Sequence, residues 1–128
     1  MDKILVVDDD IDLLDMVKLF LQRKNFMVSA ICKWEEIEAS IKTFNPALIL
    51  LDISLKGADG RVICKQLKTT PETKDIPVLI FSGNYNVRPT LSEFLADGFI
   101  EKPFDPANLV NEINLILYPG AISTGNIP

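Results

Sequence analysis

Histidine is absent from the 128 residues of this chain, which also carries only two cysteines and one tryptophan. Without histidine the chain lacks the commonest general base and the usual metal ligand, and it cannot itself form a phosphohistidine. Cys32 and Cys64 form neither a CxxC motif nor a metal-spaced set, so we expect buried thiols in a reducing compartment rather than a disulfide. These absences exclude histidine-based catalysis and a zinc-type centre.

Long hydrophobic runs and positive charge are scarce as well. No apolar run approaches the roughly 20 residues that cross a bilayer, and the start MDKILVVDDD is too short in apolar residues and too acidic for a signal peptide. Thirteen Lys and Arg oppose 18 Asp and Glu, giving a net charge of −5. Such a balance argues against a surface that grips phosphates, so we expect no nucleic acid partner, no membrane contact and a cytoplasmic location.

Hydrophobic residues, by contrast, make up 48% of the chain, enough at this length for one domain with its own core. Most of the predicted strands are nearly continuous apolar runs, as in parallel sheets covered on both faces; they span 3–8, 26–31, 47–52, 76–81 and 98–101. Helical spacing or helix-start signals mark the segments 11–24, 34–44, 60–69, 89–97 and 106–117. Asp10 and Asp105 are candidate N-caps.

The alternation of strand and helix predicts the fold class. Five repeats of strand and helix favour an α/β, (βα)5 flavodoxin-like fold with right-handed crossovers. Its five-stranded parallel sheet would have the order 2-1-3-4-5, with helices on both faces. We expect this domain to span residues 1–118; residues 119–128, which begin with Pro-Gly and small polar residues, would be a tail or the start of a linker.

Polar side chains end four of the predicted strands. Asp8 and Asp9 follow the first strand and Asp52 ends the third; Ser82 and Lys102 follow the fourth and fifth. In the predicted order these strand ends meet at one edge of the sheet, where open α/β sheets bind their ligands. Carboxylates suit Mg²⁺, and a carboxylate beside a metal ion and a lysine can become an aspartyl-phosphate. Each residue alone has an ordinary explanation as a cap, turn or loop residue, but their coincidence favours phosphoryl transfer.

The chain resembles the receiver domains of two-component response regulators, including the single-domain chemotaxis regulators, over roughly residues 2–118. The resemblance rests on four motifs, which are VVDDD at 6–10, LLDISLKGADG at 50–60, FSG at 81–83 and FIEKPF at 99–104. It implies a signalling switch that catalyses only its own phosphorylation and dephosphorylation, and that is not otherwise an enzyme.

The resemblance also implies which residues bind the metal ion and the phosphoryl group. Asp52 would accept the phosphoryl group, with Mg²⁺ as the cofactor. Asp9, Asp52 and the backbone carbonyl of Ser54 would bind the ion directly, while Asp8 would hold a metal-bound water. Lys102 would then contact the phosphoryl oxygens.

Three further positions have roles by the same resemblance. Ser82 would hydrogen-bond the phosphoryl group, and Phe99 would be the aromatic side chain that turns inward on activation. The Lys102–Pro103 bond would be cis and aim the lysine, and Gly60 would open the third helix. The implied donor is a sensor histidine kinase or a histidine phosphotransfer protein. The output protein or domain stays unknown, and the face of the fourth helix, fifth strand and fifth helix would serve signalling or a homodimer.

The chain departs from the family pattern in two loops. Lys56 and Gly57 stand where a proline usually follows the acceptor, so we expect a looser loop or an added positive charge there. Leu95 stands where a glycine commonly precedes the fifth strand. Both departures leave the chemical positions intact, and the second lies on the face through which the family signals.

Other functions fit the sequence less well. A Mg²⁺-dependent phosphohydrolase with an aspartyl intermediate usually carries a second Asp two residues after the first, where this chain has Ser54, and it needs a cap domain. A flavin-type binder needs a glycine-rich phosphate loop after the first strand, where this chain has acids. A receiver that acts only as a scaffold would not need both Asp52 and Lys102. Whether the chain is a complete regulator or part of a longer protein stays open.

Overall fold

The computed structural model describes residues 1–83 and 92–120. The strands are β1 (Lys3–Val7), β2 (Met27–Ile31), β3 (Leu48–Asp52), β4 (Ser54–Leu55), β5 (Ala58–Asp59), β6 (Val78–Ser82) and β7 (Gly98–Glu101). The α-helices are α1 (Ile11–Arg23), α2 (Ile37–Phe44), α3 (Gly60–Thr69) and α4 (Pro106–Leu117), and a 3-10 turn (Trp34–Glu36) leads into α2.

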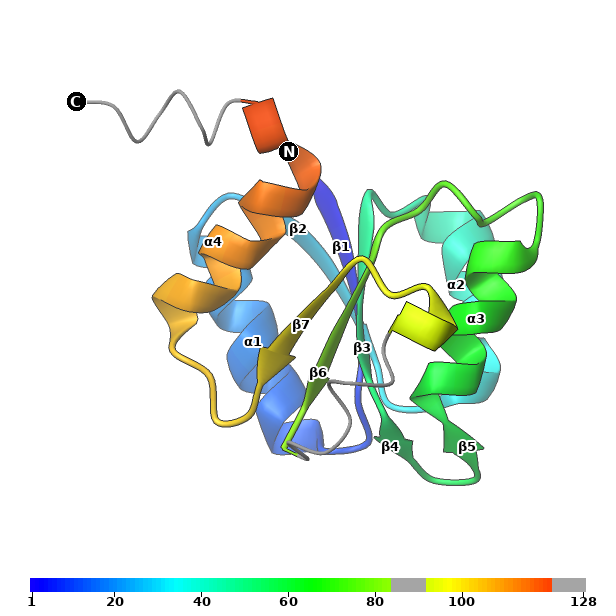
Figure 1. Cartoon of the computed structure of the whole chain (residues 1–128). Coiled ribbons are helices and arrows are strands. Elements are labelled where there is room, and N and C mark those ends of the chain that lie inside the picture. The colour runs from blue at the N-terminus through cyan, green and yellow to red at the C-terminus, as the bar shows by residue number, and fades with distance from the viewer. Residues whose placement is uncertain (84–91, 121–128) are drawn as a thin grey trace.

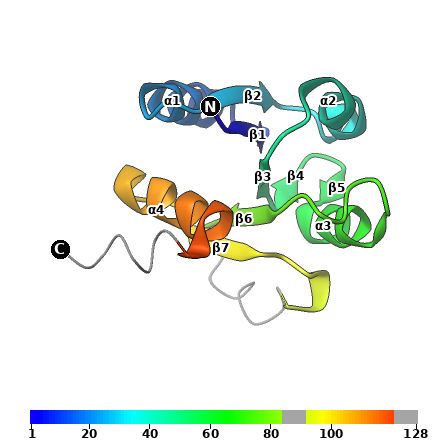
Figure 2. The same ribbon diagram turned by 90° about the horizontal axis from the view of Figure 1, so that it is seen from above.

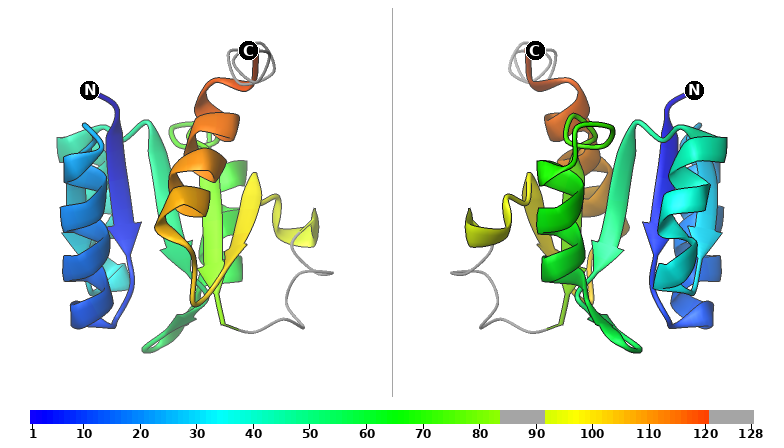
Figure 3. Two further views of the ribbon diagram at one scale, coloured as in Figure 1. Left: turned by 90° about the vertical axis from the view of Figure 1, so that its left-hand side faces the viewer. Right: turned by 90° about the vertical axis from the view of Figure 1, so that its right-hand side faces the viewer.

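Five of the strands form one parallel sheet, in the order β2-β1-β3-β6-β7 (Figure 1). This is the predicted order 2-1-3-4-5, because β4 and β5 form a separate antiparallel pair. The predicted flavodoxin-like fold is therefore confirmed. Since all five strands run the same way, their carboxyl ends lie along one edge, as the arrowheads in Figure 3 show.

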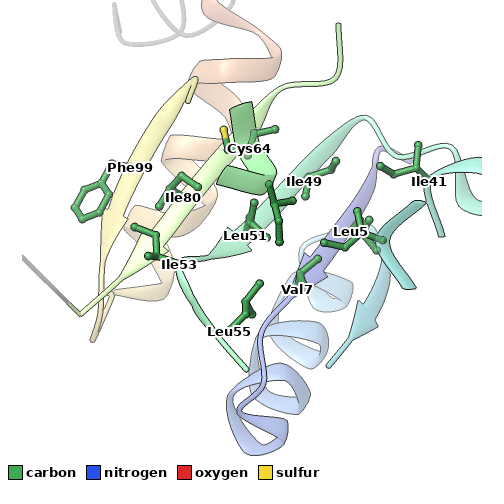
Figure 4. Packing of buried hydrophobic residues seen from close by; sticks show 13 residues of the cluster. Leu5, Val7, Ile41, Ile49, Leu51, Ile53, Leu55, Cys64, Ile80 and Phe99 are labelled. Atoms are coloured by element: carbon green, nitrogen blue, oxygen red, sulfur yellow. The ribbon is translucent and has the colours of Figure 1, made fainter. Parts of the chain in front are cut away.

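Helices cover both faces of the sheet, which explains why most of the strand residues are apolar. Seen from above in Figure 2, α1 and α4 lie on one face, and α2 and α3 lie on the other. A buried apolar cluster fills each gap, and Leu5, Ile49 and Ile80 belong to the cluster under α2 and α3 (Figure 4). Ile4, Leu50 and Phe81 belong to the opposite cluster. Strand residues therefore alternate between two cores rather than between core and solvent.

Short polar residues begin three of the helices. The Asp10 carboxylate accepts a hydrogen bond from the Leu13 amide at 3.2 Å, and Asp105 accepts one from Ala107 at 3.0 Å. Both predicted N-caps are thus present, and Pro106 occupies the first turn of α4. Asp59 caps α3 in the same way, through the Arg61 amide at 2.9 Å.

The structure corrects three expectations from the sequence. Cys64 is buried but Cys32 is exposed, and both are free thiols. The loop around Lys56 and Gly57 is not loose: it is the two-residue turn between β4 and β5, with Gly57 at a φ of 80°. The helix predicted over 89–97 does not extend to residue 97. Residues 92–94 form a 3-10 turn that ends before Leu95, and residues 89–91 lie outside the described part. No helix in the described ranges is long and apolar enough to cross a membrane.

Candidate functional site

Three carboxylates meet at the carboxyl edge of the sheet. Asp8 and Asp9 follow β1, Asp52 is the last residue of β3, and these strands are hydrogen-bonded neighbours. One oxygen of each carboxylate lies within 4.8 Å of the others. Asp8 and Asp52 are almost fully buried, with 2% and 5% of their surface exposed. Such close, buried like charges repel each other strongly unless a cation lies among them.

The Lys102 ammonium supplies one positive charge to this cluster. Its Nζ donates to Asp8 Oδ2 at 2.7 Å and lies 3.2 Å from Asp52 Oδ1. Lys102 follows β7, at the far edge of the sheet from β1, so its side chain extends across the end of β6 to reach both partners. The backbone supports this placement, because the Lys102 amide donates to the Ser82 carbonyl at 2.9 Å.

Burial and charge set the protonation of the cluster. Desolvation, aided by the nearby charge of Asp8, raises the pKa of Asp52 to about 6, although Lys102 opposes the shift. Desolvation lowers the pKa of Lys102, but its hydrogen bond to Asp8 and the charges of Asp52 and Asp8 outweigh burial and raise that pKa overall. At neutral pH the Asp52 carboxylate is thus ionised, but keeping this charge buried costs free energy. A further cation or a phosphoryl group would change that cost.

Asp9 shows that the cluster fits a metal ion. Its Oδ2 accepts a hydrogen bond from the Lys56 amide in the β4–β5 turn at 2.8 Å. Its Oδ1 is buried and, within residues 1–83 and 92–120, has no hydrogen-bond partner. A buried carboxylate oxygen that accepts no hydrogen bond costs free energy unless a cation binds to it. Three hard oxygen ligands of this kind are typical of a Mg²⁺ site.

The other predicted site residues lie around this cluster. Ser82 ends β6 and is 2% exposed, and Phe99 in β7 is 8% exposed. Phe99 belongs to the cluster under α2 and α3, at its outer end (Figure 4). The Lys102–Pro103 bond is cis. Ser54 opens β4, two residues beyond Asp52, and its carbonyl stays a predicted ligand.

Gly60 has a structural reason to be glycine. A Cβ at this position would lie 2.1 Å from the Asp52 carbonyl oxygen and 2.8 Å from the Ile53 Cα. The Gly60 amide instead donates to the Ile53 carbonyl at 2.8 Å. The start of α3 can therefore rest directly on the backbone of the acidic residue that ends β3.

Sequence reasoning missed two contacts of the site. The Lys56 amide reaches Asp9 only because β4 and β5 form a hairpin, and strands this short have no periodic sequence pattern that would predict them. The ring of Phe81 lies under the Lys102 ammonium, with Nζ 4.5 Å from the ring centroid. The signal for this second contact was present in the FSG motif, as an aromatic residue directly before Ser82.

Known proteins resemble this chain over nearly its whole length. A putative response regulator from Chloroflexus aurantiacus superposes with a TM-score of 0.85 at 30% identity, over 91% of this chain and 97% of that one. The chemotaxis protein CheY4 of Vibrio cholerae shares the fold with a TM-score of 0.84, at 24% identity, over 91% of this chain and 99% of that one.

Curated relatives are longer than this chain. The phosphate regulon transcriptional regulatory protein PhoB of Escherichia coli is 36% identical, over 90% of this chain and 51% of its own length. The DNA-binding dual master transcriptional regulator RpaA of Synechocystis is 29% identical, over 91% of this chain and 49% of its length. The chain thus spans about half the length of these two curated relatives.

The family itself follows from a match to the response regulator receiver domain over residues 4–114. Those residues include the parallel sheet except Lys3, the three neighbouring carboxylates, and the lysine that contacts two of them. Receiver domains of this family are signalling modules that accept phosphoryl groups from histidine kinases. This chain belongs to the response regulator receiver domain family.

Proposed function

We propose that this chain is a phosphorylation-dependent switch in which Asp52 accepts the phosphoryl group of a phosphohistidine. The donor is a sensor histidine kinase or a histidine phosphotransfer protein. The observation that carries the proposal is the buried contact of one ammonium with two carboxylates, Lys102 Nζ with Asp8 at 2.7 Å and with Asp52 at 3.2 Å. A structural ion pair needs only one carboxylate, whereas a phosphoryl site needs a nucleophile, a metal-binding acid and a cation together.

The chain's own residues define the transfer step. An Asp52 carboxylate oxygen attacks phosphorus, the bond from phosphorus to the donor nitrogen breaks, and its electron pair leaves with the imidazole. Lys102 exchanges its contact with Asp52 for one with the phosphoryl oxygens while remaining near Asp8. Mg²⁺ bound by Asp9, Asp52 and the Ser54 carbonyl, with Asp8 through a water, would neutralise negative charge on the transferring group.

The signal follows from the charge that phosphorylation adds. A phosphoryl group on Asp52 brings about two negative charges at neutral pH, and it draws the Ser82 hydroxyl and Lys102 toward it. Ser82 and Lys102 are already joined by a backbone hydrogen bond of 2.9 Å, so movement of one displaces the other. Phe99, one strand away from Ser82, changes its packing and passes the change to the surface.

The output acts at a surface that includes β7 and α4, either on a downstream protein or domain or on a second copy of this chain. Residues 1–118 form the switch, and residues 119–128 form a tail or the start of a linker. PhoB and RpaA, which are about twice as long, are named as transcriptional regulators.

The test is phosphorylation by a small donor. Incubation with acetyl phosphate and Mg²⁺ should add one phosphoryl group to the intact protein, measured by mass spectrometry, and EDTA should prevent the gain. Asp52→Ala should abolish it. Asp12→Asn, which removes an exposed acid in the first turn of α1, is the matched control and should leave it unchanged.

Two results would contradict the proposal. One is the absence of any mass gain in the wild-type protein, and the other is a gain that persists in Asp52→Ala. Steady turnover of a generic phosphate ester, without accumulation of the phosphorylated protein, would instead favour the phosphohydrolase.

A further inference from the structure

We infer that Phe81 is a positioning residue for Lys102: its ring holds the ammonium over β6 on the way to Asp8 and Asp52. The inference rests on the proposed function, because the placement matters for phosphoryl transfer. The observation behind it is the 4.5 Å distance from Lys102 Nζ to the centroid of the Phe81 ring. Phe81 is fully buried, so the ring is a fixed part of the site.

The sheet register explains why this ring lies in the path of the lysine. Phe81 is the Cα partner of Asp52 on one side and of Ile100 on the other. Paired residues of a parallel sheet point to the same face, and Phe81 and Ile100 both lie in the cluster under α1 and α4. Lys102 comes two residues after Ile100 and so returns to that face. Its side chain must cross the position of Phe81 to reach Asp52.

The neighbouring aromatic residue fixes the orientation of the ring. Phe104 contacts Phe81 edge to face, with the centroids 6.3 Å apart and the planes at 62°. Phe104 and Lys102 flank Pro103, so one ring packs against both neighbours of the proline. Edge-to-face packing of this kind favours a single ring orientation, which keeps one face available to the ammonium.

A ring suits this position better than an aliphatic or an acidic side chain. The negative face of an aromatic ring attracts an ammonium without accepting its proton and without using up its hydrogen-bond donors. Leucine would fill space but would not attract the ammonium, and a further carboxylate would add to the repulsion among Asp8, Asp9 and Asp52. Lys102 therefore keeps donors for its carboxylate partners and can still move toward a phosphoryl group.

The test compares variants that keep the volume near Phe81 but alter the ring. Phe81→Leu removes the ring, while replacement of Phe81 by 3,4,5-trifluorophenylalanine keeps its shape and weakens the negative face. Phe26→Leu is the matched control, because Phe26 is 7% exposed in the same apolar cluster but precedes β2, at the opposite end of the sheet. The rate constant of phosphorylation is measured at saturating acetyl phosphate and Mg²⁺.

We expect the rate constant to fall about fivefold in Phe81→Leu, the size of one partly buried cation–π contact. The fluorinated protein should lie between Phe81→Leu and the wild type, and Phe26→Leu should match the wild type. Equal rates in the wild-type, fluorinated and Phe81→Leu proteins would overturn the inference. So would an equal loss in Phe26→Leu, which would indicate a general packing defect.

A second measurement separates this inference from the proposed function. In the metal-free protein, the ε-methylene protons of Lys102 should show an upfield ring-current shift by NMR that is lost in Phe81→Leu and kept in Phe26→Leu. If the wild type accepts no phosphoryl group but shows this shift, the proposed function fails while the placement of Lys102 by Phe81 stands. Absence of the shift in the wild type overturns the placement itself.

Discussion

The chemistry of Asp52 depends strongly on its surroundings. It is 5% exposed and lies next to a second buried acid, and these two conditions oppose its ionisation. Lys102 relieves only part of the cost, since the pKa of Asp52 stays raised to about 6. Ionised Asp52 thus destabilises the metal-free protein, and a bound cation would offset that cost.

This raised pKa predicts how the stability of the metal-free protein depends on pH. Between about pH 4 and pH 6 the folded state holds a proton on Asp52 that the unfolded state has lost, so the contribution of Asp52 to stability falls as pH rises and then levels off. A shift of about two pKa units corresponds to about 2–3 kcal/mol. Asp52→Asn should therefore be more stable than the wild type at pH 7, and the difference should shrink toward pH 4.5.

Urea unfolding in EDTA at both pH values measures this prediction. Taking the difference between the two proteins at each pH cancels the titration of other acids. A difference that is equal at pH 7 and pH 4.5 would show that Asp52 keeps an ordinary pKa in the folded state.

At the scale of elements, the junction before β7 carries a local strain. Leu95 adopts a φ of 63°, a left-handed conformation that costs a residue with a Cβ roughly 1 kcal/mol. Leu95 is 45% exposed, so its side chain is only partly buried. A glycine at this position would adopt the turn without strain, although it would also gain freedom in the unfolded chain.

We therefore expect Leu95→Gly to stabilise the protein by about 0.5 kcal/mol in urea unfolding. Leu95→Ala is the matched control, because it removes the same side chain but keeps the Cβ and its strain. The glycine variant should be more stable than the alanine variant by about 0.5 kcal/mol, because the relief of strain exceeds the extra freedom of glycine in the unfolded chain. If the alanine and glycine variants are equally stable, the left-handed conformation of residue 95 does not reduce the stability of the protein.

Much of this architecture could be predicted from residue pattern alone. A strand buried on both faces is a continuous apolar run, so the prediction for 47–52 differs from β3 by one residue. Helix starts were equally visible, because Asp10 and Asp105 supply the caps. The hairpin of β4 and β5 could not be predicted, because strands of two residues show no periodicity. The helix predicted over 89–97 differs from the structure in its described part, where residues 92–94 form a 3-10 turn.

The sequence predicts which strand ends form the site, but it does not predict all the contacts between the residues there. Topology alone brings Asp8, Asp52 and Lys102 to one edge of the sheet. The contact of Lys102 with Phe81 depends on which face each side chain takes, and that of Asp9 with the Lys56 amide depends on a turn 47 residues away. Contacts of this kind are set by register and loop geometry rather than by residue type.

At the scale of the whole molecule, metal binding should act on the stability of the entire fold. A ligand that binds only the folded state stabilises it, by about 1.4 kcal/mol when present at ten times its Kd. Mg²⁺ should therefore raise the midpoint of thermal unfolding, and EDTA should reverse the rise. Asp9→Asn should abolish the response, because the buried Oδ1 that has no partner in the described structure is replaced or made neutral.

The metal-free proteins provide the control for this prediction. The amide oxygen of Asp9→Asn can still accept the hydrogen bond from the Lys56 amide, so this variant should be at least as stable as the wild type without metal. Asp9→Ala loses that bond and should be less stable by about 1 kcal/mol. A full Mg²⁺ response in Asp9→Asn would contradict the assignment of Asp9 to the cation site.

The contact between Asp8 and Lys102 joins residues 94 positions apart and so spans most of the chain. During synthesis β1 and β3 are complete long before β7, since the chain grows by about 5–20 residues each second. The acids that follow β1 and end β3 are therefore synthesised before their lysine exists. A nascent or truncated chain that ends before residue 102 therefore holds its carboxylates without that cation.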